Sequence, residues 1–218
     1  MNNPKPLTLY AHEIRRLLTG EPVLVVRPVK KDAQRVFWNQ IIVNGYGGWT
    51  DEHGRPCPCP FHDGQCYWVR ETWGAWPDWY GGIQRNSLRY KATDNKPDDP
   101  HNAWVWRSPV TMPQRYSRLS IVVDDTAVKQ VQEIGEDEVE MTGIDYWEPF
   151  KTHSTKYCKV YPPLYDGDGV CYSAEECDCC GHSMNEIFGL LHDSHFPDHP
   201  YSANPYCWLA TVRKSDGA

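Results

Sequence analysis

Cysteine and histidine side chains cluster in two stretches of this 218-residue chain, with a spacing typical of metal binding. The second stretch contains Cys177-x-x-Cys180-Gly181, the spacing of a zinc knuckle, in which two thiolates chelate one ion and the glycine permits a tight turn. Zinc suits such donors because it accepts four sulfur or nitrogen ligands in a tetrahedron. We predict one or two structural zinc ions, either one per stretch or one shared, with these ligands: Cys57, Cys59, His62, Cys66, Cys171, Cys177, Cys179 and Cys180.

The expected compartment supports a metal rather than disulfides. Residues 1–6 lack the apolar segment of a secretory signal, so we expect a cytoplasmic location, where disulfides are rare. The alternative for any cysteine is burial as a small hydrophobic side chain, which we predict for Cys158 and Cys207 because they lie among strand-like aromatic residues. The longest apolar runs, such as residues 23–26, are far shorter than the roughly 20 residues of a membrane span, so no membrane partner is expected.

Charge is distributed unevenly along the chain. The net charge is −7, but residues 1–120 carry 16 Lys and Arg against 11 Asp and Glu, whereas residues 121–218 carry 6 against 18. The acidic total argues against a protein that coats duplex DNA through bulk charge. It leaves room for a basic face in the first half of the chain, although such a fluctuation also arises without function.

Tryptophans and cations alternate between residues 68 and 106. Rings of this kind stack on the bases of a single strand, contributing about 1–3 kcal/mol per base, while neighbouring cations hold phosphates. The alternative is that the rings fill the core, and we expect about half of them to do so. The residues are Trp68, Trp73, Trp76, Trp79, Trp104 and Trp106, with Arg70, Arg89, Lys91 and Arg107 between or beside them.

Short strands outnumber helices in the expected secondary structure. Hydrophobic periodicity predicts strands at 23–29, 67–73, 88–92, 119–131 and 207–213, and helices at 9–20, 135–141 and 184–192. Residues 44–66 and 145–183 are expected to be cysteine-bearing loop excursions. Pro197 and Pro200 should break any helix there, so we predict a solvated loop for the series His192, His195 and His199. The pattern indicates a single domain over 1–218, a β-rich α+β fold and a small barrel.

One segment resembles a known family. Gly64-x-x-x-Trp68-Val69-Arg70-Glu71-Thr72-Trp73 is similar to the "GDxLWVRETW" signature of the ASCH family, within the PUA-like superfamily, in the version common in bacteriophage genomes. Further blocks follow in the family's order, at residues 106–113, 116–119, 131–144, 191–194 and 204–208. The resemblance spans residues 9–213, apart from the two cysteine-bearing excursions. It implies a small PUA-like β-barrel with flanking short helices and a cleft beside the first helix, suited to RNA or a modified nucleoside.

The resemblance also implies an enzymatic alternative. One branch of the family hydrolyses the N4-acetyl amide of acetylcytidine with a lysine and a threonine from a "GRKTxTxR" motif and a glutamate from a later strand. In this chain Pro22 and Val25 stand where the lysine and the threonine would be, and only Gly20, Arg27 and Glu71 match. Neither replacement can act as a nucleophile, a base or an oxyanion donor. An amidohydrolase acting on N4-acylated cytidine nucleosides is therefore the alternative prediction.

Glu71 is the candidate catalytic residue. Burial among tryptophans would raise its pKa toward the range useful for general acid–base catalysis. It could instead accept hydrogen bonds from a base edge, or pair with Arg70 or Arg118. We predict binding of RNA, single-stranded nucleic acid or a modified nucleotide in a cleft lined by Arg27, Arg70, Trp73, Trp76, Lys91, Arg107, Arg115 and Arg118. A third possibility is a phage-encoded module that docks on a host protein through the acidic C-terminal part.

Overall fold

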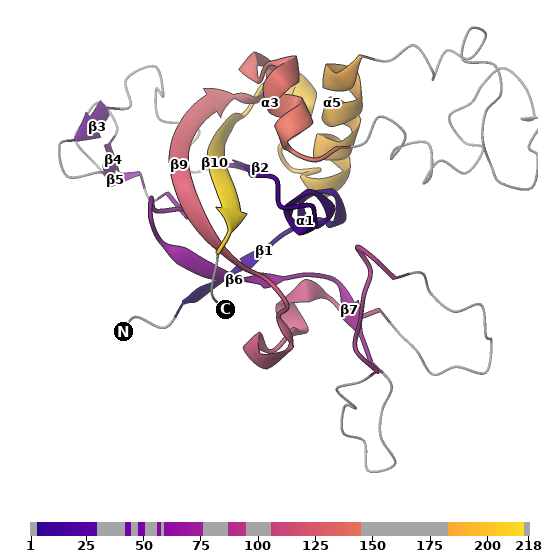
Figure 1. Cartoon of the computed structure of the whole chain (residues 1–218). Coiled ribbons are helices and arrows are strands. Elements are labelled where there is room, and N and C mark those ends of the chain that lie inside the picture. Colours follow the sequence, from indigo (N-terminus) through magenta and orange to yellow (C-terminus); the bar gives the residue numbers. More distant parts are fainter. Residues whose placement is uncertain are drawn as a thin grey trace, which may run out of the picture.

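A mixed five-stranded sheet forms the centre of the computed structural model, which describes residues 4–29, 42–44, 48–50, 56–57, 59–75, 87–94, 106–144 and 183–215 (Figure 1). The strand order is β1–β6–β9–β10–β2, in which only β1 and β6 run parallel. The strands are β1 (Lys5–Thr8), β2 (Val23–Pro28), β6 (Cys66–Arg70), β9 (Ser120–Gln130) and β10 (Tyr206–Lys214). This architecture confirms the predicted β-rich α+β class.

The sheet is open in the part of the chain that the structure describes. Strands β1 and β2 are its two edges, with no backbone ladder between them, so the predicted closed barrel is not present there. A side chain links the two edges instead: Arg27 of β2 donates a hydrogen bond from Nη2 to the carbonyl oxygen of Thr8 in β1, at 2.9 Å. The register of β9 against β10 shifts between Thr211 and Val212, and both strands curve strongly (Figure 1).

Helices cover both faces of the sheet, and this explains the continuous apolar run in β2. Val23 and Val25 face one core cluster together with Ile14 and Leu17 of helix α1 (Ala11–Leu18). Leu24 and Val26 alternate to the opposite cluster. A strand buried on both faces reads as an unbroken hydrophobic segment rather than as an alternating one.

The opposite face is covered by helices α3 (Glu136–Met141) and α5 (Met184–His195), which lie side by side above the sheet in Figure 1. Helix α5 begins with a capping box, because Ser183 and Glu186 satisfy each other's backbone N–H groups. It runs through His195 and ends directly before Phe196-Pro197, so the predicted solvated loop was wrong for His192 and His195. Pro197 still ends the helix, because its ring disfavours helical backbone at the preceding residue, Phe196, which is the C-cap. No helix in the described part of the chain is long and apolar enough to cross a membrane.

Two smaller units flank the sheet. One is a three-stranded antiparallel sheet of β3 (Ile42–Asn44), β4 (Gly48–Thr50) and β5 (Pro56–Cys57), so the excursion predicted as loop over 44–66 contains strand structure. The other joins β7 (Trp73–Gly74) to β8 (Arg89–Tyr90) and to two 3-10 turns, η3 (Pro109–Thr111) and η4 (Gln114–Tyr116). Its own core consists of Trp73, Ala75, Met112 and Tyr116. The excursion predicted at 145–183 lies outside the described residues, except for Ser183.

Gly143 sets how closely the end of α3 approaches α1. Its φ is +78°, and a Cβ built there would lie 2.8 Å from the backbone oxygen of His12. Gly20, at the end of α1, has a similar positive φ of +91° but open space around it. Comparing Gly143 with Gly20 therefore distinguishes two effects of an added Cβ: the backbone strain that both positions share, and the steric clash that occurs at Gly143 alone.

We expect Gly143→Ala to lower the free energy of unfolding by about 2–4 kcal/mol, because it adds a clash with fixed backbone to the strain of a positive φ. Gly20→Ala should lower it by about 1 kcal/mol, from strain alone. Urea denaturation of both variants measures the difference. Equal losses would show that Gly143 is not needed for close packing.

Candidate functional site

Glu71 follows β6 and is held in a bidentate ion pair. The residue is 1% exposed, and its two carboxylate oxygens accept hydrogen bonds from Nε and Nη2 of Arg118, each at 2.9 Å. Burial raises the pKa of Glu71, and the hydrogen bonds and charge of Arg118 offset only part of that rise. Of the roles foreseen for this carboxylate, the structure shows the pairing with Arg118. Each oxygen already accepts one hydrogen bond from Arg118, and the burial of the side chain restricts access to the remaining lone pairs.

Four arginines near this pair lie over aromatic rings. A guanidinium over a ring is attracted by the ring's quadrupole and loses side-chain freedom before any ligand arrives. The distances from the guanidinium carbon to the ring centroid are 4.9 Å for Arg70 over Trp68, 5.2 Å for Arg107 over Trp73, 4.7 Å for Arg115 over Tyr116 and 4.2 Å for Arg118 over Tyr90.

These arginines belong to a positively charged region, which we call the basic lobe and define as residues 70–75, 87–94 and 106–118. It has two carboxylates and six cations, namely Arg70, Arg89, Lys91, Arg107, Arg115 and Arg118. Both carboxylates are engaged within the lobe, because Glu71 pairs with Arg118 and Asp94 Oδ2 accepts from the backbone N–H of Tyr90 at 2.8 Å. The remaining cations therefore give the surface a net positive charge.

Two of the six tryptophans predicted to stack on a ligand, Trp68 and Trp73, lie in the core instead, whereas Trp106 is half-buried and Trp79 and Trp104 lie outside the described residues. Trp73 is 1% exposed, and its Nε1 donates to Thr111 Oγ1 at 3.3 Å. Trp68 is buried as well, between the sheet and Arg70. Their rings support arginines from beneath and have no free face. Trp76 lies outside the described residues.

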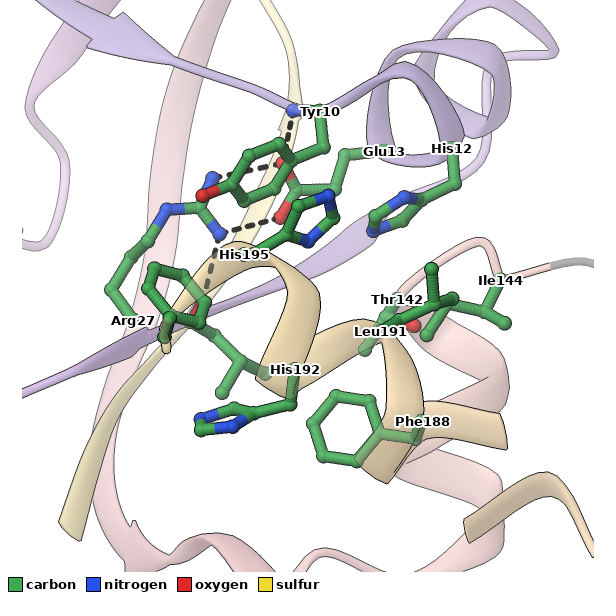
Figure 2. A pocket seen from close by; sticks show the side chains of 12 residues that line it. Tyr10, His12, Glu13, Arg27, Thr142, Ile144, Phe188, Leu191, His192 and His195 are labelled. Carbon is green, nitrogen blue, oxygen red and sulfur yellow. Dashed lines mark hydrogen bonds and ion pairs between the residues drawn. The ribbon is translucent and has the colours of Figure 1, made fainter. Parts of the chain in front are cut away.

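Arg27, also predicted to bind the ligand, lies elsewhere, in a pocket between α1 and the end of α5 (Figure 2). Its Nη1 and Nη2 donate to the two oxygens of Glu13 at 2.8 and 2.9 Å. Glu13 Oε2 also accepts from the backbone N–H of Tyr10 at 2.7 Å. The opening is narrow, with about 20 Å³ available to the centre of a water molecule, which is room for one or two waters.

Stacked rings line this Arg27 pocket. The Tyr10 ring lies parallel to the His195 ring, with centroids 3.7 Å apart, and Arg27 lies over the same tyrosine at 4.6 Å (Figure 2). Burial, with the nearby His12, lowers the pKa of His195 to about 4, so this ring is neutral near pH 7. Burial alone would raise the pKa of Glu13, but Arg27 outweighs it and holds that pKa below its ordinary value. The pocket thus contains one balanced ion pair and a neutral imidazole.

The first cysteine stretch does not form a metal site within the described residues. Cys59 packs against the main core, and burial raises the pKa of its thiol to about 11. His62 and Cys66 are exposed, and no three His, Cys, Asp or Glu side chains in the described part of the chain could hold an ion together. The side chain of Cys57 and the whole of Cys171, Cys177, Cys179 and Cys180 lie outside that part. Zinc therefore stays a prediction. The burial predicted for Cys207 is confirmed.

Sequence reasoning named Arg27 but missed its partners in the Arg27 pocket. Glu13 was visible as a carboxylate within the apolar pattern of the first helix, and Arg27 as a cation at the end of an apolar strand. Two opposite charges on core-facing elements indicate a buried pair, because neither is stable there alone. His195 had no such signal, since its place depends on how far α5 extends.

We expect Glu13→Gln to lower the free energy of unfolding by about 3 kcal/mol or more, because it leaves the buried Arg27 charge without a counter-charge. The matched control is Glu21→Gln, which breaks the exposed pair of Glu21 with Arg16 at 3.1 Å and should cost less than about 1 kcal/mol. Urea denaturation near pH 7 compares the two variants. Similar losses would mean that the Arg27 pair contributes no more than a surface pair.

The ion pair of the basic lobe gives a pH-dependent test. Because the folded-state pKa of Glu71 is raised above its ordinary value of 4.5, its contribution to stability is greatest below pH 4.5 and falls as pH rises through the folded-state pKa. Arg118→Met leaves the burial unopposed and raises this pKa further. We expect a loss of about 3–5 kcal/mol at pH 7 and a smaller loss at pH 5. When Arg118→Met is made in the Glu71→Gln background and compared with Glu71→Gln alone, the loss should no longer depend on pH. A single-variant loss that is equal at both pH values would contradict the assignment.

Comparison with known proteins gives no relative from which a role could be transferred: no family model, curated protein or solved structure matches the chain.

Proposed function

We propose that the protein binds single-stranded nucleic acid, RNA in particular, through the basic lobe. The observation that carries this proposal is the set of four arginines lying over aromatic rings in a region where both carboxylates are already engaged. A PUA-like fold of the ASCH type, with an open sheet in place of a closed barrel, and a cytoplasmic location belong to the same proposal. The support for that fold is that the motif blocks at 64–73, 131–144 and 204–208 coincide with β6–β7, η5 (Val131–Glu133) with α3, and the start of β10.

The arginines can contribute to binding in two ways. Their charges attract phosphates, and a guanidinium fixed on one face by a ring offers its other face to a nucleobase. Arg107 and Arg115 are exposed, so their outer faces are open to a ligand. The rings beneath them are already packed, so binding requires little reordering, which favours affinity.

A single strand fits this surface better than a duplex. The net charge of the whole chain is −7, and α3 carries Glu136, Asp137, Glu138 and Glu140. In Figure 1, α3 lies at the opposite end of the molecule from β7, so these carboxylates are distant from the basic lobe. A rigid duplex extending beyond the lobe would meet acidic surface, whereas a flexible strand can follow the lobe alone.

No contact in the described structure favours the amidohydrolase alternative. Both oxygens of Glu71 are occupied by Arg118, and Pro22 and Val25 supply no reactive group. Docking on a host protein likewise stays a prediction, since it rests only on the acidic composition of the C-terminal part.

The test is a titration of a fluorescein-labelled 12-nucleotide RNA, followed by anisotropy at several salt concentrations. For the double variant Arg107→Gln/Arg115→Gln we expect about tenfold weaker binding at low salt, and a salt slope shallower by about 1.4, because two phosphate contacts are lost. The control Arg213→Gln/Lys214→Gln removes the same charge from the exposed end of β10 and should have a much smaller effect. Absence of binding by the unmodified protein, or equal weakening by both double variants, would refute the proposal.

A further inference from the structure

Val110, the central residue of η3, has its side chain directed into solvent. It is 69% exposed, more than the two other exposed large hydrophobic side chains of the described residues, Leu190 at 46% and Leu18 at 40%. A single exposed valine on a mobile loop would need no explanation. Here the backbone that carries it is anchored on both sides.

The turn around Val110 is held by a dense set of hydrogen bonds. The backbone N–H of Thr111 donates to the carbonyl oxygen of Ser108 at 3.0 Å, and the Thr111 hydroxyl donates to the same oxygen at 2.7 Å. Met112, the next residue, is 2% exposed and donates its N–H to the carbonyl oxygen of Pro109 at 3.0 Å. The turn is thus fixed to the core of the basic lobe two residues after Val110, at Met112.

The same hydrogen-bond network ties the turn to the arginine supports. Thr111 Oγ1 accepts from Nε1 of Trp73, the ring over which Arg107 lies. Arg107 and Trp73 are also paired through their backbones, at 2.7 and 3.4 Å. Val110 and Arg107 are therefore displayed by one rigid unit.

The charged residues close to Val110 in the sequence indicate the chemistry of the partner that its side chain contacts. Along residues 106–118 the charged residues are Arg107, Arg115 and Arg118, with no carboxylate among them. An apolar side chain between exposed cations complements a surface that alternates apolar faces with anions. A nucleic-acid strand has this character, since its bases are apolar in the stack and its phosphates are anionic.

We infer that Val110 packs against the face of a base in the bound strand, as a wedge between neighbouring bases, while Arg107 and Arg115 hold the flanking phosphates. The inference rests on the proposed function and specifies how that site contacts the bases. Apolar side chains inserted beside bases, with cations on the backbone, are a recognised mode of nucleic-acid binding. Recognition of this kind depends on the presence of a base and tolerates different sequences.

The experiment compares two probes, a 12-nucleotide RNA and a strand of the same length in which the internal residues are abasic. For Val110→Ala we expect about fivefold to tenfold weaker binding of the base-bearing strand and unchanged binding of the abasic strand. Arg107→Gln should weaken both, because phosphates are present in both. Leu190→Ala, which truncates an exposed leucine on α5, is the matched control and should change neither. Val110→Leu should retain binding.

Each outcome separates the inference from the proposed function. If the unmodified protein binds neither strand, the proposed function fails and the inference fails with it. If it binds RNA but Val110→Ala binds as well as the unmodified protein, the inference is overturned and the function stands. If Val110→Ala weakened binding of the base-bearing and the abasic strand equally, the inference would also be overturned, because Val110 would then affect the structure of the basic lobe and not a contact with a base. Anionic phospholipid vesicles are a third probe. If Val110→Ala abolished binding to these vesicles and left RNA binding unchanged, the partner of Val110 would be a lipid surface, and the proposed base contact would be overturned.

Discussion

The buried ion pair of Arg27 and Glu13 is the constraint on which the central sheet depends. Arg27 lies in the edge strand β2 and donates hydrogen bonds to the carboxylate of Glu13 in α1. It also donates to the carbonyl oxygen of Thr8 in the other edge strand, β1. Three elements that are separate in the hydrogen-bond ladder are thereby held by one guanidinium. A buried arginine can do this because its planar group has five donors in fixed directions, whereas a lysine has a single point of charge. The pair adds little net stability over an apolar substitute, but it fixes which elements meet.

The basic lobe contains a second buried arginine–glutamate pair, in which the pKa of the glutamate is shifted in the opposite direction. Glu71 is as buried as Glu13, and an arginine again binds both carboxylate oxygens. The pKa directions differ: burial prevails at Glu71, whereas the charge of Arg27 prevails at Glu13, where a backbone N–H also supports the carboxylate. The difference matters for function, since Arg107 and Arg115 have no such partner carboxylate within the described residues of the lobe and are exposed over their rings.

Much of the fold follows from local sequence patterns, whereas most of the site does not. The apolar runs at 23–29, 119–131 and 207–213 predicted three strands of the sheet, because a run buried on both faces leaves a strong signal. The role of the tryptophans was harder to predict, since stacking on a ligand and packing beneath an arginine require the same residues at the same spacing. The Arg27 pocket depends on contacts between α1, β2 and α5, which are distant in sequence. No periodicity encodes such contacts.

The open sheet determines where the native structure opens locally. Between β1 and β2 the ladder of many backbone hydrogen bonds is replaced by one side chain from β2 to one carbonyl of β1. Separating those edges breaks one hydrogen bond and the apolar contacts between α1 and β2, but no backbone ladder, so this local opening should cost less free energy than separating β9 from β10. The outward-facing amides of β1 and β2 should then exchange with solvent faster than those of β9 and β10, which each lie between two neighbouring strands. The sheet should therefore open locally between the edge strands β1 and β2, beside α1.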